Sequence, residues 1–136
     1  MFSLFKKKSI IVPEFKEISN YENKNKYFIR IKKWDWLNSD EIVIYEKDEK
    51  SKITTHTVDF WYQEIFLDAK GDYTVKEYLG ILANQFIQDK KKIPEDLDVM
   101  LIEYLDSLEK ELKCIEFLIG PKELDYEFKE PLSKQK

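Results

Sequence analysis

Apolar residues follow a strand-like pattern in the first half of this chain and a helical period after residue 58. Between residues 27 and 58, β-branched and aromatic residues form three short runs, 27–32, 41–46 and 53–58, which are separated by polar turns. Runs of this length and composition are typical of strands. We expect these three strands to pair as a small antiparallel meander.

The period becomes helical after residue 58. Asp59 can cap a helix that runs to about Leu67, and Thr74 with Glu77 forms a capping box for a second helix. A third helix follows Pro94, a residue that suits the first helical turn. The apolar stripe of the second helix is Val75, Tyr78, Leu79, Leu82, Ala83 and Phe86, and that of the third is Leu97, Met100, Leu101, Tyr104, Leu105, Leu108 and Leu112.

These elements predict an α+β, winged-helix-like fold, in which a small antiparallel sheet of about three strands is followed by three helices and a short C-terminal strand over residues 114–119. Gly71 is expected in a loop between the first two helices, where a turn needs positive φ. Because each helix has one apolar stripe, the stripes can bury one another only by converging on one core. The expected members of that core are Phe66, Leu79, Leu82, Phe86, Leu101, Tyr104, Leu105 and Leu108.

The domain proper is expected over residues 27–120. Residues 1–26 are then an N-terminal extension with one short apolar run at 10–12, which predicts a short strand. Residues 121–136 form a charged C-terminal tail, expected to be loose unless Tyr126 and Phe128 pack back. Trp34 and Trp36 lie in a predicted turn, and we expect at least one of them to be buried and not part of a binding platform.

Composition narrows the classes of function. The 136 residues include 20 aromatics, which is enough apolar surface for one hydrophobic core. They include one His and one Cys, so no disulfide can form within the chain. His56 and Cys114 alone cannot build a standard zinc site, and the chain has no phosphate loop or Gly-x-Ser-x-Gly motif. We therefore expect no enzyme and no cofactor. Cys114 is expected to be a small buried apolar residue, and His56 an ordinary strand residue.

Charge and hydropathy bear on partners and location. The net charge is −4 and Arg30 is the only arginine, although arginine makes the commonest base-specific contact to DNA. Residues 94–109 carry six acidic residues and no basic one, so a recognition helix there would repel phosphates. No run approaches the roughly 20 apolar residues of a membrane span, and the N-terminal lysines follow the apolar residues, unlike a secretory signal. We expect a cytoplasmic protein that binds neither nucleic acid nor membrane.

The stretch from Val58 to Tyr78 resembles the PqqD family. In that family a strand ends in Leu-Asn, the next helix carries Glu-Ile-Trp, and a Gly-x-x-Thr-Val-x-Glu-Ile turn opens the second helix. The matching positions here are Val58-Asp59, Glu64-Ile65-Phe66, Gly71, Thr74, Val75, Glu77 and Tyr78, and residues 103–115 are similar to the family's third helix and closing residues. The resemblance covers about residues 50–118. Phe66 replaces Trp, Asp59 replaces Asn, and the N-terminal portion is longer than in a free-standing PqqD.

The resemblance implies a non-catalytic peptide-binding adaptor. PqqD-like domains recognise the leader of a ribosomally made precursor peptide, which adds a strand beside the third strand and packs against the third helix. They present this peptide to a modifying enzyme, often a radical-SAM protein. Carried over to this chain, the peptide-binding residues are Ile53, Thr55 and Thr57 on the third strand and Val99, Ile102 and Asp106 on the third helix.

Two questions stay open at this point. Val99 and Ile102 lie off the main stripe of the third helix, so either they line a groove or the N-terminal extension covers them. The alternative function is a small protein–protein interaction protein (immunity, phage or structural) with an acidic surface, and a winged-helix DNA binder is the weakest alternative. The sequence identifies neither the ligand nor the oligomeric state.

Overall fold

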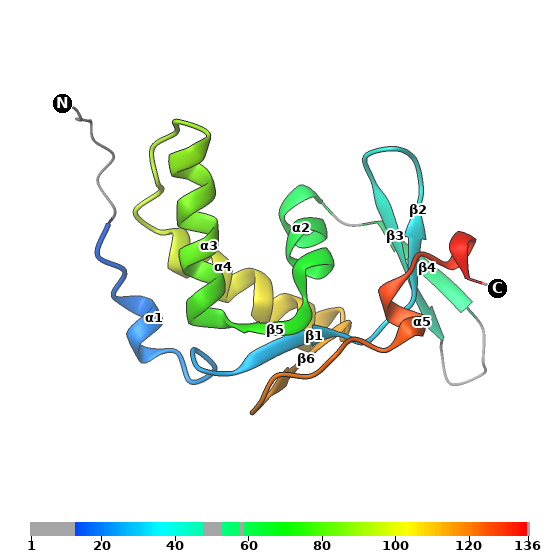
Figure 1. Cartoon of the computed structure of the whole chain (residues 1–136). Coiled ribbons are helices and arrows are strands. Elements are labelled where there is room, and N and C mark those ends of the chain that lie inside the picture. The colour runs from blue at the N-terminus through cyan, green and yellow to red at the C-terminus, as the bar shows by residue number, and fades with distance from the viewer. Residues whose placement is uncertain (1–12, 48–52, 58, 136) are drawn as a thin grey trace.

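The structure is a computed structural model that describes residues 13–47, 53–57 and 59–135. It is α+β, with two small antiparallel sheets and several helices (Figure 1). The apolar run at 10–12 lies outside the described residues. None of the helices in the described ranges combines the length and the apolar composition that a membrane crossing requires.

The first sheet has the strand order β5-β1-β6. Its central strand β1 (Tyr27–Arg30) pairs antiparallel with β5 (Lys70–Thr74) on one side and with β6 (Ile115–Leu118) on the other. Phe28 and Ile29 are therefore buried in the middle of a sheet. The predicted closing strand at 114–119 is confirmed as β6, but its partner is the first strand of the domain.

The second sheet has the order β2-β3-β4 and is an antiparallel meander. Its strands are β2 (Trp34–Trp36), β3 (Ile42–Lys47) and β4 (Ile53–Thr57). The meander has the expected three strands, but its first strand is the segment at 34–36 that the sequence predicted as a turn.

The prediction that 27–32 belongs to this meander is wrong, because the chain changes sheets just after β1. The Ile31 amide still donates to the Cys114 carbonyl (2.9 Å) beside β6. Two residues later, the Lys33 carbonyl accepts a bond from the Tyr45 amide of β3 (2.8 Å). The run at 27–32 therefore belongs to one sheet, and the strand at 34–36 begins the other.

The first two predicted helices begin where the sequence predicts. Asp59 accepts a hydrogen bond from the Tyr62 amide (3.1 Å) and caps α2 (Phe60–Asp68). Thr74 and Glu77 form both bonds of the capping box at the start of α3 (Val75–Gln88). The third helix is α4 (Leu97–Asp106), so the prediction that Pro94 lies in its first turn is wrong: Pro94 precedes the helix. The helix continues into a π-helical segment, η1 (Ser107–Glu111).

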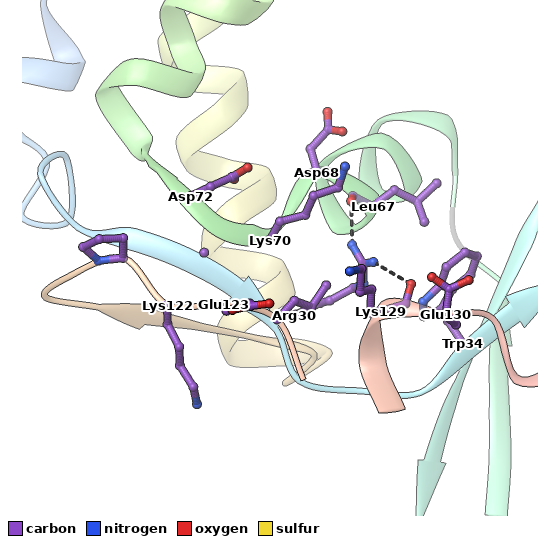
Figure 2. A pocket seen from close by; sticks show the side chains of 13 residues that line it. Arg30, Trp34, Leu67, Asp68, Lys70, Asp72, Lys122, Glu123, Lys129 and Glu130 are labelled. Atoms are coloured by element: carbon purple, nitrogen blue, oxygen red, sulfur yellow. Dashed lines mark hydrogen bonds between the residues drawn. The ribbon is translucent and has the colours of Figure 1, made fainter. Parts of the chain in front are cut away.

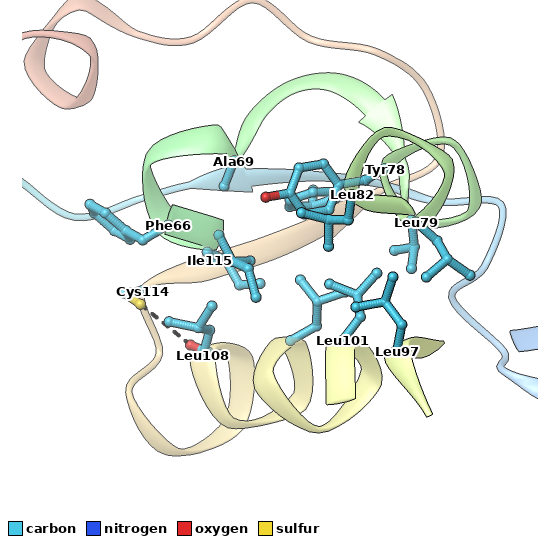
Figure 3. Packing of buried hydrophobic residues seen from close by; sticks show 14 of the residues in the cluster. Phe66, Ala69, Tyr78, Leu79, Leu82, Leu97, Leu101, Leu108, Cys114 and Ile115 are labelled. Carbon is cyan, nitrogen blue, oxygen red and sulfur yellow. Dashed lines mark hydrogen bonds between the residues drawn. The ribbon is translucent and has the colours of Figure 1, made fainter. Parts of the chain in front are cut away.

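The predicted core forms between these helices and the first sheet (Figure 3). Of the eight expected members, six are buried, and Phe86 and Tyr104 pack against them while partly exposed. The same cluster continues into the second sheet through Trp34, Ile42 and Ile44, so both sheets share one core. Gly71 has the expected positive φ of 78°, but it lies within β5 and not in a loop.

Both end segments pack on the domain. The extension contributes the short helix α1 (Glu17–Asn20), whose Ile18 is buried in the core. The C-terminal segment forms α5 (Tyr126–Lys129) and the 3-10 turn η2 (Leu132–Lys134). Its Phe128 is half-buried and lies beside the second sheet, whereas Tyr126 is exposed, so the tail packs back through one of the two aromatic residues named above.

Candidate peptide-binding surface

β4 lies at the edge of the second sheet. Among the residues that the structure describes, it pairs only with β3. The opposite edge of the same sheet, β2, is next to η2, where the amide and hydroxyl of Ser133 donate to Asp35 (3.1 and 2.8 Å). The β4 edge is therefore the side of this sheet at which a further strand can be added.

The direction of the backbone groups on β4 follows from one hydrogen bond on β3. The Tyr45 amide points towards β2, because it donates to the Lys33 carbonyl (2.8 Å). Residues directly opposite in an antiparallel pair exchange both bonds or none, and the two kinds alternate. The Tyr45–Thr55 pair is thus of the kind without bonds, and the backbone groups of Thr55 point away from β3.

The same alternation applies two residues on in each direction. Ile53 and Thr57 stand opposite Lys47 and Val43, so their amides and carbonyls also face the outer edge. These three residues are the ones that the sequence predicted for peptide binding on the strand. What they offer a peptide is a row of main-chain donors and acceptors at the spacing of a β-ladder.

The predicted residues on α4 have a different environment. The Tyr21 hydroxyl donates to Asp106 (3.0 Å), and the Ile18 amide donates to Asp98 (3.1 Å). Ile102 stands one helical turn from each of these carboxylates, on the same face, and is partly buried against the core. The extension therefore packs on the face of α4 that carries Ile102 and Asp106, which favours the alternative in which it covers this flank. Val99 is half-buried.

The two groups of predicted residues do not meet in one groove. α1 and the α4 flank that it covers lie at one end of the molecule, and the β2-β3-β4 sheet lies at the other (Figure 1). A strand added at the β4 edge would therefore lie away from the covered flank of α4.

The two neighbouring tryptophans have different environments. Trp34 is buried, and its indole N–H donates to the Phe128 carbonyl (2.9 Å). Trp36 is 43% exposed, with its ring edge-to-face against Trp34 at 5.6 Å between centroids. The prediction that at least one of them is buried is confirmed.

A cavity of about 770 Å³ lies beside Arg30, between β1, the end of α2 and the C-terminal segment (Figure 2). Arg30 is only 3% exposed. Its Nε donates to the Phe128 carbonyl (2.7 Å), and its terminal nitrogens donate to the carbonyls of Leu67 (2.5 Å) and Lys129 (3.2 Å). Burial lowers the pKa of Arg30 to about 10, against the opposing effect of Asp68 and Glu130, so the side chain stays cationic at neutral pH.

This cavity has no preference for one sign of charge. Its described lining residues include four basic and four acidic side chains: Arg30, Lys70, Lys122, Lys129, Asp68, Asp72, Glu123 and Glu130. The guanidinium itself is engaged by the chain's own carbonyls at the ends of α2 and α5. We interpret Arg30 as a structural residue that holds the ends of α2 and α5 together through hydrogen bonds. The sequence carried no sign of this role beyond the residue being the only arginine.

Cys114 is fully buried, as predicted. Its Sγ donates to the Leu108 carbonyl (3.6 Å), and burial raises the pKa of the thiol to about 12. A thiol in this state is a poor nucleophile, since the thiolate is the reactive form. In the described ranges, no three His, Cys, Asp or Glu side chains are arranged to hold a metal ion.

No family model, curated protein or solved structure matches this chain. The similarity of residues 58–78 to the PqqD family therefore depends on the matching residues themselves and on the local structure that they adopt.

Proposed function

We propose that this protein is a non-catalytic adaptor that binds an extended peptide by strand addition along β4. The observation that carries the proposal is the outer edge of β4, where the backbone groups of Ile53, Thr55 and Thr57 face away from β3. In strand addition, main-chain bonds supply affinity and alternate side chains of the peptide supply specificity.

The local structure of the PqqD-like stretch supports the same proposal. Asp59 caps α2, Phe66 fills a fully buried aromatic position, and Gly71 has positive φ. These are the physical roles that the family's Asn, Trp and Gly positions require. We infer a winged-helix-like arrangement of β2-β3-β4 with α2, α3 and α4. The peptide is then the leader of a precursor that the adaptor presents to a modifying enzyme, such as a radical-SAM protein.

The covered flank of α4 makes one difference from the family's binding mode. Ile18 and Tyr21 occupy the face of α4 on which the resemblance places the peptide. The proposal therefore assigns the peptide to the β4 edge and does not require displacement of the extension.

The test is an NMR titration of the ¹⁵N-labelled protein with overlapping synthetic peptides from a short open reading frame that neighbours the gene. We expect shift changes at residues 53–57. Thr55→Pro removes an outward amide without breaking a bond to β3, a position at which edge strands tolerate proline. It should weaken binding by about tenfold or more, the effect of about 1.4 kcal/mol, whereas Thr55→Ala keeps the amide and should bind within about threefold of the parent.

Circular dichroism of both variants checks that the sheet is intact. Shift changes confined to residues far from 53–57, or equal binding by Thr55→Pro and Thr55→Ala, would count against strand addition.

A further inference from the structure

A second, smaller cavity lies between α2 and α3, with a volume of about 180 Å³. At about 30 Å³ per water molecule, this is the volume of roughly six waters, which suits one long side chain. One wall is aromatic: Trp61 and Phe86 stack with centroids 6.3 Å apart and planes 21° from parallel. Phe60 packs edge-to-face on Trp61 at 5.6 Å and is 65% exposed, so an apolar rim faces solvent.

Carboxylates surround this aromatic wall. Glu64 and Asp68 line the cavity one turn apart on α2, and Asp89 lines it from the C-cap of α3. Lys91 is the one basic side chain among the described lining residues. In the described part of the chain, none of the three carboxylates has a salt-bridge partner, and Asp68 accepts a hydrogen bond from the Tyr78 hydroxyl (2.7 Å). Partial burial, together with the charge of Asp68, raises the pKa of Glu64.

The end of α3 adds to the negative potential. The carbonyls of the last helical turn carry the negative end of the helix dipole, which favours a cation near the C-terminus. Because Gln85, Phe86 and Asp89 all line the cavity, this helix end adjoins it. The cavity thus offers aromatic faces and negative charge together, a combination that attracts a cation through both the ring quadrupole and Coulomb energy.

We propose that this cavity receives an arginine side chain of the peptide that binds along β4, an inference that rests on the proposed function. β4 ends at Thr57 and α2 begins at Phe60, which lines the cavity, so a few extended residues at about 3.3 Å each span the gap. Arginine fits better than lysine, because its planar guanidinium stacks on aromatic rings and binds carboxylates in a fork. The ligand class is then an extended peptide with an arginine just beyond its strand-forming segment.

The cavity is tested first without any peptide. The probe is Nα-acetyl-arginine methylamide, and its citrulline analogue serves as the control of similar shape without the charge. We expect the arginine compound to shift the Trp61 indole resonance and to lower the pKa of the Glu64 carboxyl, measured by NMR, with the citrulline compound at least about tenfold weaker. Glu64→Gln and Trp61→Leu should each weaken binding several-fold, whereas Glu103→Gln, an exposed acid on α4, should not.

The variants separate failure of this inference from failure of the proposed function. Arginine-amide binding that persists in Thr55→Pro but is lost in Glu64→Gln supports the cavity even if no peptide adds to β4. A different result would overturn the proposal that the cavity receives an arginine but leave strand addition standing. In that result, peptide binding is weakened by Thr55→Pro but is unchanged both by Glu64→Gln and by replacing the peptide's arginine with citrulline. Equal binding of the arginine and citrulline amides also overturns it.

Discussion

Arg30 and Asp98 are the buried charged residues among those that the structure describes, and each holds one end of the chain in place. Arg30 donates to carbonyls of the C-terminal segment, and Asp98 accepts from the Ile18 amide of the extension. A buried charge is costly unless it is hydrogen-bonded, so each contact also satisfies the charged group. The Ile18 amide is 80 residues from Asp98 and the Phe128 carbonyl is 98 residues from Arg30. The sequence therefore showed Asp98 only as one of the acids of residues 94–109 and indicated no structural role for Arg30.

The buried thiol of Cys114 predicts that the protein loses stability at alkaline pH. Its thiol has a pKa of about 12 in the folded protein against 9.0 for an unperturbed thiol, so the unfolded state loses its proton first as pH rises. The stability that this group contributes is present below about pH 9 and is lost between pH 9 and 12, at a rate of up to about 1.4 kcal/mol per pH unit. Urea titrations at pH 8, 9 and 10 should show a steeper alkaline loss for the parent than for Cys114→Ala.

Tyr78 also has a pKa raised by burial, but its effect begins near pH 10 and is common to both proteins. In the native protein, DTNB should react with Cys114 only as fast as the protein opens. Equal alkaline slopes, or rapid labelling of the native protein, would show that the thiol is accessible.

Among the elements, local signals located α2, α3 and α4 but missed α1, α5 and the strand β5. Its sequence, Lys-Gly-Asp-Tyr-Thr, has a weak strand propensity, because Gly and Asp are depleted in strands. It is a strand because β1 supplies a partner for it, with Tyr27 opposite Thr74 and Ile29 opposite Lys70. Gly71 is buried there, so the residue interpreted as a turn glycine serves a close approach of two backbones.

The two glycines at 71 and 80 make a matched pair for testing this difference. A Cβ on Gly71 would lie 2.3 Å from the Lys122 carbonyl oxygen, at a φ of 78° that other residues rarely adopt. Gly71→Ala should therefore lower the free energy of unfolding by about 1–3 kcal/mol or more. Gly80 is exposed on α3, and a Cβ added there would have nothing within 4 Å. Gly80→Ala should therefore raise the free energy of unfolding by about 0.5–1 kcal/mol. Urea denaturation measures both, and a neutral Gly71→Ala would contradict the close approach.

At the scale of the molecule, the two sheets and the helices share one core, and the C-terminal segment closes its junction. The Phe128 carbonyl accepts bonds from both the Arg30 guanidinium and the Trp34 indole. Arg30 also lies over the Trp34 ring, 5.6 Å from its centroid. One carbonyl of the last segment thus joins the first sheet to the second.

Removal of residues 126–136 should therefore destabilise the whole protein. Arg30 loses two carbonyl acceptors and Trp34 loses one, and hydrogen bonds to charged groups contribute about 1.5–3 kcal/mol each, so we expect a loss of about 2–5 kcal/mol. The Trp fluorescence of the folded protein should also shift to the red as Trp34 becomes solvated. Ser133→Ala, which removes only an exposed contact to Asp35, is the control and should cost under about 1 kcal/mol. An unchanged melting temperature after truncation would show that the segment is not part of the fold.

Local sequence was enough to predict the starts of α2 and α3, the apolar stripes that share the core, the β3-β4 hairpin and the burial of Cys114. Each of these depends on the hydrophobic pattern or on residues a few positions apart, as in the Thr74–Glu77 capping box, whose partners are three residues apart. Tertiary structure alone decided the partners of β1, the strand at 70–74, the covering of Ile102 by the extension and the position of β4 at an edge. These depend on contacts between segments tens of residues apart, where many pairings have similar local energies and only packing of the whole chain selects one.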